Sequence, residues 1–179
     1  MTQVGSVYGE ALYVLAKDEG LSDEIMHQLR ILDEGFAGEP EFIRLLSAPN
    51  LSKEERCGIV DDCFRGKVHV YVCSFLKLLT EKGYAKHFSA CVKTYQEQYN
   101  LDHGILPVTA VTAVPLTEGQ MGRLTEKLSG ITGKTVELNC RVDPAVLGGV
   151  RLDYDGKRVD DTVSHRLDAI RGMLKNTVL

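Results

Sequence analysis

The chain changes its pattern of apolar residues within LDHGILPVTAVTAV, residues 101–114, and this stretch decides the fold. Before Gly104, apolar residues recur every three or four positions, which is the period of an α-helix. After Gly104 they alternate, with Val108, Ala110 and Thr112 on one side, which is the period of a β-strand. We therefore predict an α+β protein with a helical bundle over residues 1–103 and a small α+β domain over residues 104–179.

About six helices are predicted before that boundary. Gly20 ends the first, Pro40 suits the first turn of the third, and Ser52 with Glu55 forms a capping box at the start of the fourth. The sixth has the most regular apolar stripe. Its members are Tyr84, Phe88, Cys91, Val92, Tyr95 and Tyr99.

Residues 104–179 are predicted to form, in order, a strand, a helix, further strands and a last helix. Thr117 and Gln120 form a second capping box, and Gly133 ends that helix. Asp155-Gly156 predicts a hairpin turn, and Pro107 predicts either a strand start or an edge strand. The remaining expectations are a helix face of Met121, Leu124, Leu128 and Ile131, a strand of Val136, Leu138, Cys140 and Val142, and a last helix capped by Asp160 or Asp161 with Val163, Leu167, Ile170 and Leu174.

Composition excludes several classes of protein. The 179 residues carry a formal charge of −4, which gives no electrostatic basis for general nucleic-acid binding. No apolar run approaches the ~20 residues of a membrane-spanning helix, and the first ten residues lack the features of a signal peptide. The five cysteines form no C-x-x-C pair, so we expect them to be reduced and mostly buried, with no disulfide framework and no zinc site.

Catalytic motifs are missing from the sequence. Gly133-Lys134-Thr135 resembles the end of a phosphate-binding loop, but Leu128 stands where that motif needs glycine, so we interpret Gly133 as a helix C-cap. His69 and Cys73 could share a helix face, yet two ligands do not make a zinc site. We expect no catalytic residue, no metal and no cofactor.

The fifth predicted helix is apolar on more than one face. Its core is VHVYVCSFLKLL, residues 68–79, and the first helix is also broad, with Val7 and Val14 off its main stripe. Such a helix is either the centre of its own bundle or one wall of a groove that takes an amphipathic helix from another protein. The sequence leaves both interpretations open.

Three segments resemble the delta subunit family of F-type ATP synthases, which includes the mitochondrial oligomycin-sensitivity-conferring protein. They are residues 8–16, YGEALYVLA; residues 112–117, TAVPLT; and residues 143–151, DPAVLGGVR, followed by Asp155-Gly156-Lys157 and Arg166-Leu167. The family's Asp-Gly-Ser after the last strand is Asp160-Asp161-Thr162 here. The C-terminal signature residues are Asp143, Pro144, Leu147, Gly148, Gly149, Val150, Asp155, Gly156, Arg166 and Leu167.

The resemblance implies a non-catalytic subunit of the peripheral stalk, or stator, that holds the catalytic head while the central shaft rotates and so couples proton flow to ATP synthesis. The implied partners are the N-terminal helix of the alpha subunit, the head, and the b-subunit stalk. The implied location is the cytoplasmic face of a bacterial cell membrane. The residues that would contact the alpha helix are Tyr8, Ala11, Leu12, Leu15, Tyr71, Phe75, Leu78 and Leu79.

Two other functions remain as alternatives. A generic helical adaptor with an α+β module would bind some other amphipathic helix through the same apolar surface. A small enzyme would need convergent polar groups in one cleft, and the sequence places no such set.

Overall fold

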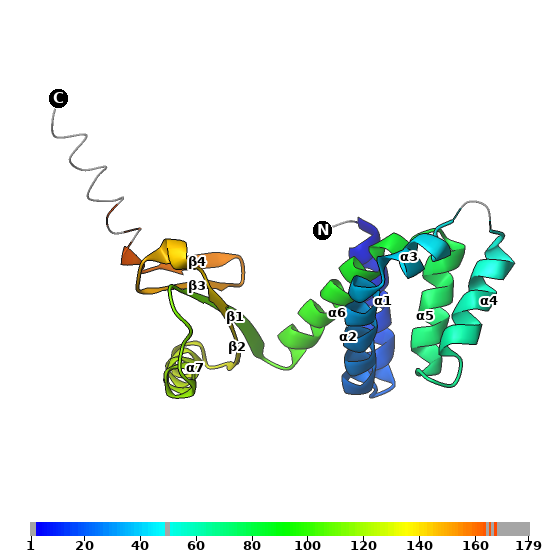
Figure 1. The fold of residues 1–179 in the computed structure, drawn as a ribbon. Helices are drawn as coiled ribbons and strands as arrows, with labels where there is room; N and C mark the ends of the chain where they lie inside the picture. Colours follow the sequence, from blue (N-terminus) through cyan, green and yellow to red (C-terminus); the bar gives the residue numbers. More distant parts are fainter. Residues whose placement is uncertain (1–2, 49–50, 164, 166, 168–179) are drawn as a thin grey trace, which may run out of the picture. The chain divides into compact units, whose positions relative to one another are not determined.

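The computed structural model describes residues 3–48, 51–163, 165 and 167, which form two units, Met1–Tyr99 and Asn100–Leu179. Figure 1 shows the elements of each unit. The helices are α1 (Gln3–Asp18), α2 (Ser22–Gly38), α3 (Pro40–Leu46), α4 (Lys53–Phe64), α5 (Val70–Glu81), α6 (Phe88–Asp102) and α7 (Glu118–Thr132), with 3₁₀ turns η1 (Ala85–His87) and η2 (Pro144–Val146). The strands are β1 (Ile105–Thr112), β2 (Thr135–Val142), β3 (Val150–Tyr154) and β4 (Lys157–Asp160). The predicted α+β class is confirmed.

Local signals set the helix ends as predicted. The Ser52 hydroxyl accepts the Glu55 backbone N–H at 3.1 Å, and the Glu55 carboxylate accepts the Ser52 N–H at 2.8 Å. These hydrogen bonds favour the ionised carboxylate and lower the pKa of Glu55. Thr117 and Gln120 form the second capping box, and Gly133 ends α7 with a left-handed φ of 66°. Gly133 is therefore a helix C-cap, as interpreted from the sequence.

One apolar core fills the helical unit. Tyr95 of α6 is fully buried, its ring packs edge-on against Tyr13 of α1 at 5.2 Å, and its hydroxyl donates to the Ser22 carbonyl at 3.0 Å. Burial raises the pKa of Tyr95 well above its ordinary value. This side chain joins α1, α2 and α6. The core also contains Leu12, Ala16, Ile25, Leu29, Leu32, Leu46, Val60, Val72, Phe75, Leu76, Leu79, Phe88, Cys91 and Val92.

Two glycines let α1 lie unusually close to α6. A Cβ atom added at Gly5 would lie 2.8 Å from the Cβ of Ala90. A Cβ atom at Gly9 would overlap the backbone oxygen of Cys91 and lie 2.9 Å from the Cβ of Thr94. Because backbone blocks the space at Gly9, a larger residue forces the two helices apart.

Gly9→Ala should lower the free energy of unfolding of the helical unit by about 2–3 kcal/mol, the cost of forcing an extra carbon into a packed interface. Urea unfolding followed by tyrosine fluorescence measures this, because every tyrosine except Tyr154 lies in that unit and the chain has no tryptophan. The matched control is Gly58→Ala in α4, where an added Cβ meets nothing within 4 Å. That control should be stabilising by about 0.4–1 kcal/mol, and equal effects of the two changes would contradict the packing argument.

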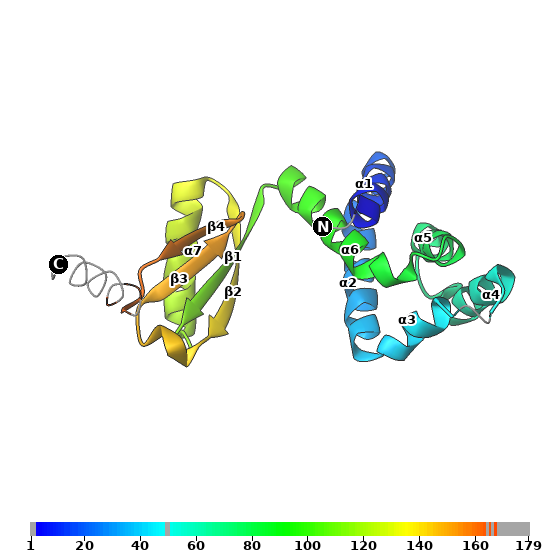
Figure 2. The same cartoon turned by 90° about the horizontal axis from the view of Figure 1, so that it is seen from above.

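The C-terminal unit is a four-stranded sheet in the order β2-β1-β3-β4, with α7 across one face (Figure 2). β1 and β2 are parallel and joined through α7, whereas β3 pairs antiparallel with both β1 and β4. Leu106, Val108 and Val136 form the buried centre, against which Leu128 of α7 packs. Asp155 and Gly156 both have positive φ in the β3–β4 hairpin, as its sequence predicts.

β1 is a central strand, so the prediction that Pro107 marks an edge strand is wrong, whereas the other expectation, a strand start, fits its place as the third residue of β1. The structure also shows why proline is tolerated there. Pro107 pairs with Glu137 of β2, but pairing between β1 and β3 begins one residue later, at Val108 opposite Tyr154. Only one neighbouring strand therefore faces Pro107, and its missing N–H leaves the ladder to β3 intact.

Two apolar expectations in this unit are wrong. Ile131, predicted on the apolar face of α7, is 82% exposed, and Cys140, one of five cysteines predicted to be mostly buried, is exposed. Ile131 lies in the last turn of α7 and Cys140 on the edge strand β2, and no further layer of the described residues covers them. The helical period of α7 and the alternation along β2 predicted which face each side chain points to, but not how far the helix and the sheet cover each other.

The signature loop before β3 is a compact turn. The Asp143 carboxylate accepts the Ala145 N–H at 3.0 Å, Pro144 begins η2, and Leu147 has a φ of 63°. Gly149 has a φ of 80°, and a Cβ atom there would overlap the backbone oxygen of Asp161. Glycine is therefore required at position 149 by both conformation and space.

The cap of the last helix differs from the prediction. The Thr162 hydroxyl accepts the His165 N–H at 3.2 Å, and Asp160 in turn accepts the Thr162 hydroxyl at 2.6 Å. Thr162 is the capping residue, because its side-chain oxygen accepts the backbone N–H three residues later, and Asp160 orients it. Arg166, Ile170 and Leu174 lie outside the described residues.

Candidate helix-binding groove

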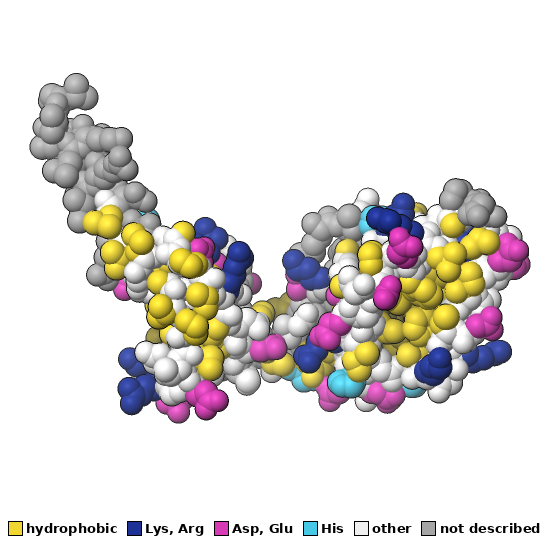
Figure 3. All heavy atoms as spheres, viewed as in Figure 1, with side chains coloured by type: hydrophobic (Ala, Val, Ile, Leu, Met, Phe, Trp, Pro, Cys, Tyr) yellow, Lys and Arg dark blue, Asp and Glu magenta, His cyan; other side chains and the backbone are white. Residues whose placement is uncertain are grey.

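An apolar groove of about 220 Å³ lies between α1 and α5. In the space-filling view it forms part of the apolar surface over these two helices (Figure 3). Its lining comes from successive turns of the two helices, four residues from each. The residues are Tyr8, Ala11, Leu12 and Leu15 of α1, and Tyr71, Ser74, Phe75 and Leu78 of α5.

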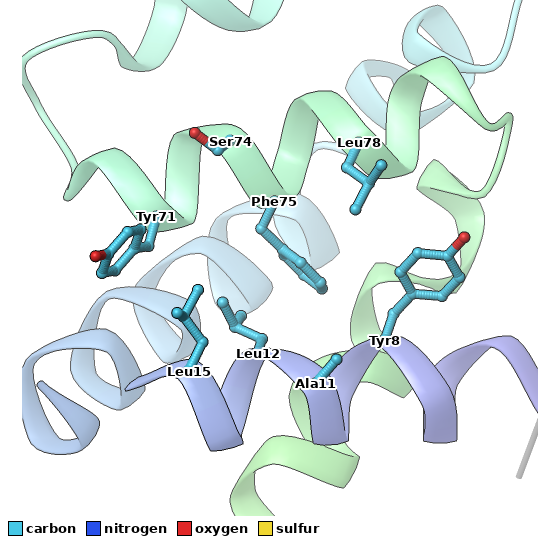
Figure 4. A pocket seen from close by; sticks show the side chains of 8 residues that line it. All are labelled: Tyr8, Ala11, Leu12, Leu15, Tyr71, Ser74, Phe75 and Leu78. Atoms are coloured by element: carbon cyan, nitrogen blue, oxygen red, sulfur yellow. The ribbon is translucent and has the colours of Figure 1, made fainter. Parts of the chain in front are cut away.

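The exposure of the lining residues increases from the floor of the groove to its rim. Leu12 and Phe75 are buried and point toward each other between the helices (Figure 4). Leu15 and Leu78 are about 40% exposed, and Tyr8 lies at the opposite end from Tyr71. A long apolar furrow with aromatic rings at both ends matches one face of an amphipathic helix better than a compact small molecule.

Seven of the eight residues predicted from the sequence line this groove. Leu79 does not: it is 1% exposed and belongs to the core of the helical unit. Adjacent residues on a helix point about 100° apart, so Leu78 faces the groove and Leu79 faces inward. Ser74 was missed because it is polar. Its spacing of three from Tyr71 and four from Leu78 is the signal that could have found it.

Residues on both walls of the groove contact residues that do not line it, and neighbouring α5 residues contact α4. The Tyr8 ring packs edge-on against Tyr84 at 5.9 Å between ring centres. On α5, Lys77 forms an ion pair of 2.5 Å with Asp61 of α4, and the Cys73 thiol donates to the same carboxylate at 3.8 Å. The hydrogen bond from Lys77 lowers the pKa of Asp61. Contacts outside the groove therefore add to the packing of Leu12 and Phe75 in fixing both helices.

The groove is suited to binding rather than to chemistry. Its lining residues include no acidic or basic side chain, and their polar side-chain groups are the hydroxyls of Ser74, Tyr8 and Tyr71. Across the described part of the chain, no group of three or more histidine, cysteine or acidic side chains is placed to hold a metal. Over the same residues, no helix is both long enough and apolar enough to cross a membrane.

Comparisons with known proteins agree on one family. The sequence model of the ATP synthase delta (OSCP) subunit matches residues 4–174. ATP synthase subunit delta of Alkaliphilus oremlandii is 28% identical over 98% of both chains, and that of Synechococcus elongatus is 28% identical over 94% of both.

A solved structure shares the fold. A chain of the Toxoplasma gondii mitochondrial ATP synthase hexamer superposes with a TM-score of 0.78 at 15% identity, over 97% of this chain and 98% of that one. The match to the family model spans nearly the whole sequence and includes both the groove and the signature loop. The chain therefore belongs to the ATP synthase delta (OSCP) subunit family and is a peripheral-stalk component of an F-type ATP synthase.

Proposed function

We propose that the groove between α1 and α5 holds the amphipathic N-terminal helix of the ATP synthase alpha subunit. The observation that carries this proposal is the lining: seven positions expected to contact that helix lie together in one uncharged furrow. The exposed halves of Leu15 and Leu78 supply apolar surface that this chain does not cover by itself. Burying such surface favours association and slows dissociation.

The same proposal assigns the C-terminal unit to the b-subunit stalk. Several large apolar side chains of that unit are exposed, among them Val114, Val142, Leu147 and Leu167. A partner that covered these side chains would remove their apolar surface from water, which favours association. The helical and C-terminal units would then act as two docking domains, one for the head and one for the stalk.

In this role the chain catalyses no reaction. It joins the head to the stalk at the cytoplasmic face of a bacterial membrane, so that the head does not turn with the central shaft. Tight apolar contacts suit a static link, because most differences in affinity between related complexes arise from dissociation rates.

Calorimetric titration of the full chain with a synthetic alpha-subunit N-terminal peptide tests the proposal. We expect one peptide per chain with a dissociation constant of about 1 μM or tighter, corresponding to about −8 kcal/mol. A peptide of the same composition with a scrambled order is the control, because it lacks a continuous apolar face. Equal binding of the two peptides, or no binding of the native one, would rule out this occupant.

A further inference from the structure

The first turn of α5 is capped by a histidine. The Nδ1 atom of His69 accepts the backbone N–H of Tyr71 at 3.3 Å. An imidazole accepts a hydrogen bond only when that nitrogen carries no proton, so this cap requires neutral His69 with its proton on Nε2. Serine, threonine, aspartate and asparagine are the usual capping residues and do not lose this capacity near neutral pH.

His69 also contacts the groove through Tyr71. The two rings lie 5.0 Å apart between centres, and Tyr71 forms one end of the groove (Figure 4). The backbone N–H of His69 donates to the Gln28 side chain of α2 at 2.7 Å, and Gln28 donates to Glu24 at 3.1 Å. His69 therefore contacts α2 through its backbone N–H and the groove residue Tyr71 through its ring.

We propose that His69 is a proton-sensitive latch on the groove: when neutral it caps α5 and holds Tyr71 in place, and when protonated it releases both. A proton taken from solvent onto Nδ1 removes the acceptor and leaves the Tyr71 N–H without its partner. It also places a positive charge at the N-terminus of α5, where the helix dipole opposes it. This inference rests on the proposed function, since the occupant is the alpha-subunit helix.

The surroundings of His69 do not counter this effect. Its contacts within the described residues include a backbone hydrogen bond to the Gln28 amide of α2, and the N–H and ring of Tyr71 in α5. The Glu24 carboxylate contacts the Gln28 amide rather than the imidazole. Within residues 3–48, 51–163, 165 and 167, no ion pair of His69 offsets the charge of a protonated ring.

Binding and protonation then oppose each other by linkage. An occupied groove needs Tyr71 in its capped position, so the bound peptide favours neutral His69. The loss of one cap together with an unfavourable dipole interaction predicts roughly tenfold weaker peptide binding at pH 5.5 than at pH 7.5. Histidine is the side chain whose charge ordinarily changes in that interval.

The test compares the full chain with its His69→Asn variant, which keeps a capping acceptor that does not titrate. Titration with the alpha-subunit N-terminal peptide at pH 7.5 and pH 5.5 should show roughly a tenfold loss in the parent chain and less than about a twofold change in the variant. His27→Asn, an exposed histidine of α2, is the matched control and should behave like the parent. An equal loss in the parent and in His69→Asn would overturn the latch.

A second measurement needs no partner. Amide exchange of Tyr71, followed by NMR in the free protein and corrected for intrinsic exchange, reports the cap directly. Protection should fall severalfold between pH 7.5 and pH 5.5 in the parent and stay constant in His69→Asn. Constant protection in both would overturn the latch even if the peptide binds. Absence of peptide binding at every pH, with the expected change in protection, would refute the occupant and leave the latch standing.

Discussion

Leu78→Glu should weaken binding of the alpha-subunit N-terminal peptide by about 30- to 1,000-fold, or about 2–4 kcal/mol. Leu78 is 40% exposed on the rim of the groove, so the free protein can keep a carboxylate there in water. An apolar helix that covers the rim must remove that water, and the uncharged lining offers the carboxylate no counter-charge. The cost therefore falls on the complex and not on the fold.

Ile31→Glu is the matched control for this change. Ile31 lies on α2, is 56% exposed and does not line the groove. The substitution makes the same replacement of an exposed aliphatic side chain by a carboxylate, at a site outside the contact. Calorimetry should show parent-like affinity for Ile31→Glu, with far-UV circular dichroism unchanged in both variants. Parent-like affinity of Leu78→Glu would remove Leu78 from the contact.

Tyr95→Ala should be the most damaging single truncation in the helical unit, lowering its free energy of unfolding by about 3–5 kcal/mol. The ring is fully buried between α1, α2 and α6 and packs edge-on against Tyr13. Removing it leaves a cavity in close-packed surroundings and also deletes the hydrogen bond to Ser22. A loss of this size is a large share of the stability of an ordinary domain.

Tyr95→Phe separates the two contributions. It keeps the ring and removes only the hydroxyl, so it should cost about 0.5–1.5 kcal/mol. Urea unfolding followed by the remaining tyrosines measures both variants in the full chain. If Tyr95→Ala cost no more than Tyr95→Phe, packing of this ring would not be a principal source of stability.

Neighbouring residues of α5 belong to different environments, one to the groove and the next to the core. Leu78 and Leu79 are chemically identical neighbours in an apolar run, yet one lines the groove and the other is buried. The sequence shows that α5 is apolar on more than one side. It does not show which side meets α4 and which remains open, because that depends on where the other helices lie.

The close approach of α1 to α6 is the second property that the sequence did not predict. Gly5 and Gly9 lie on a helix that was predicted from its apolar residues. No neighbouring residue in the sequence distinguishes them from Gly58, which faces open space. Their role appears only when α6 is placed against α1. The same holds for Cys140, since alternation cannot tell how far α7 extends across the sheet.

The sequence by itself determined the features that depend on short-range chemistry: the change of period after Gly104, both capping boxes, the C-cap at Gly133 and the hairpin at Asp155-Gly156. Each is fixed by backbone hydrogen bonds or allowed φ angles within a few residues. Tertiary structure alone decided that β1 is central, that Leu79 is inside and that α1 meets α6 through Gly9. Those outcomes depend on contacts between residues far apart in the chain, which the local pattern does not encode.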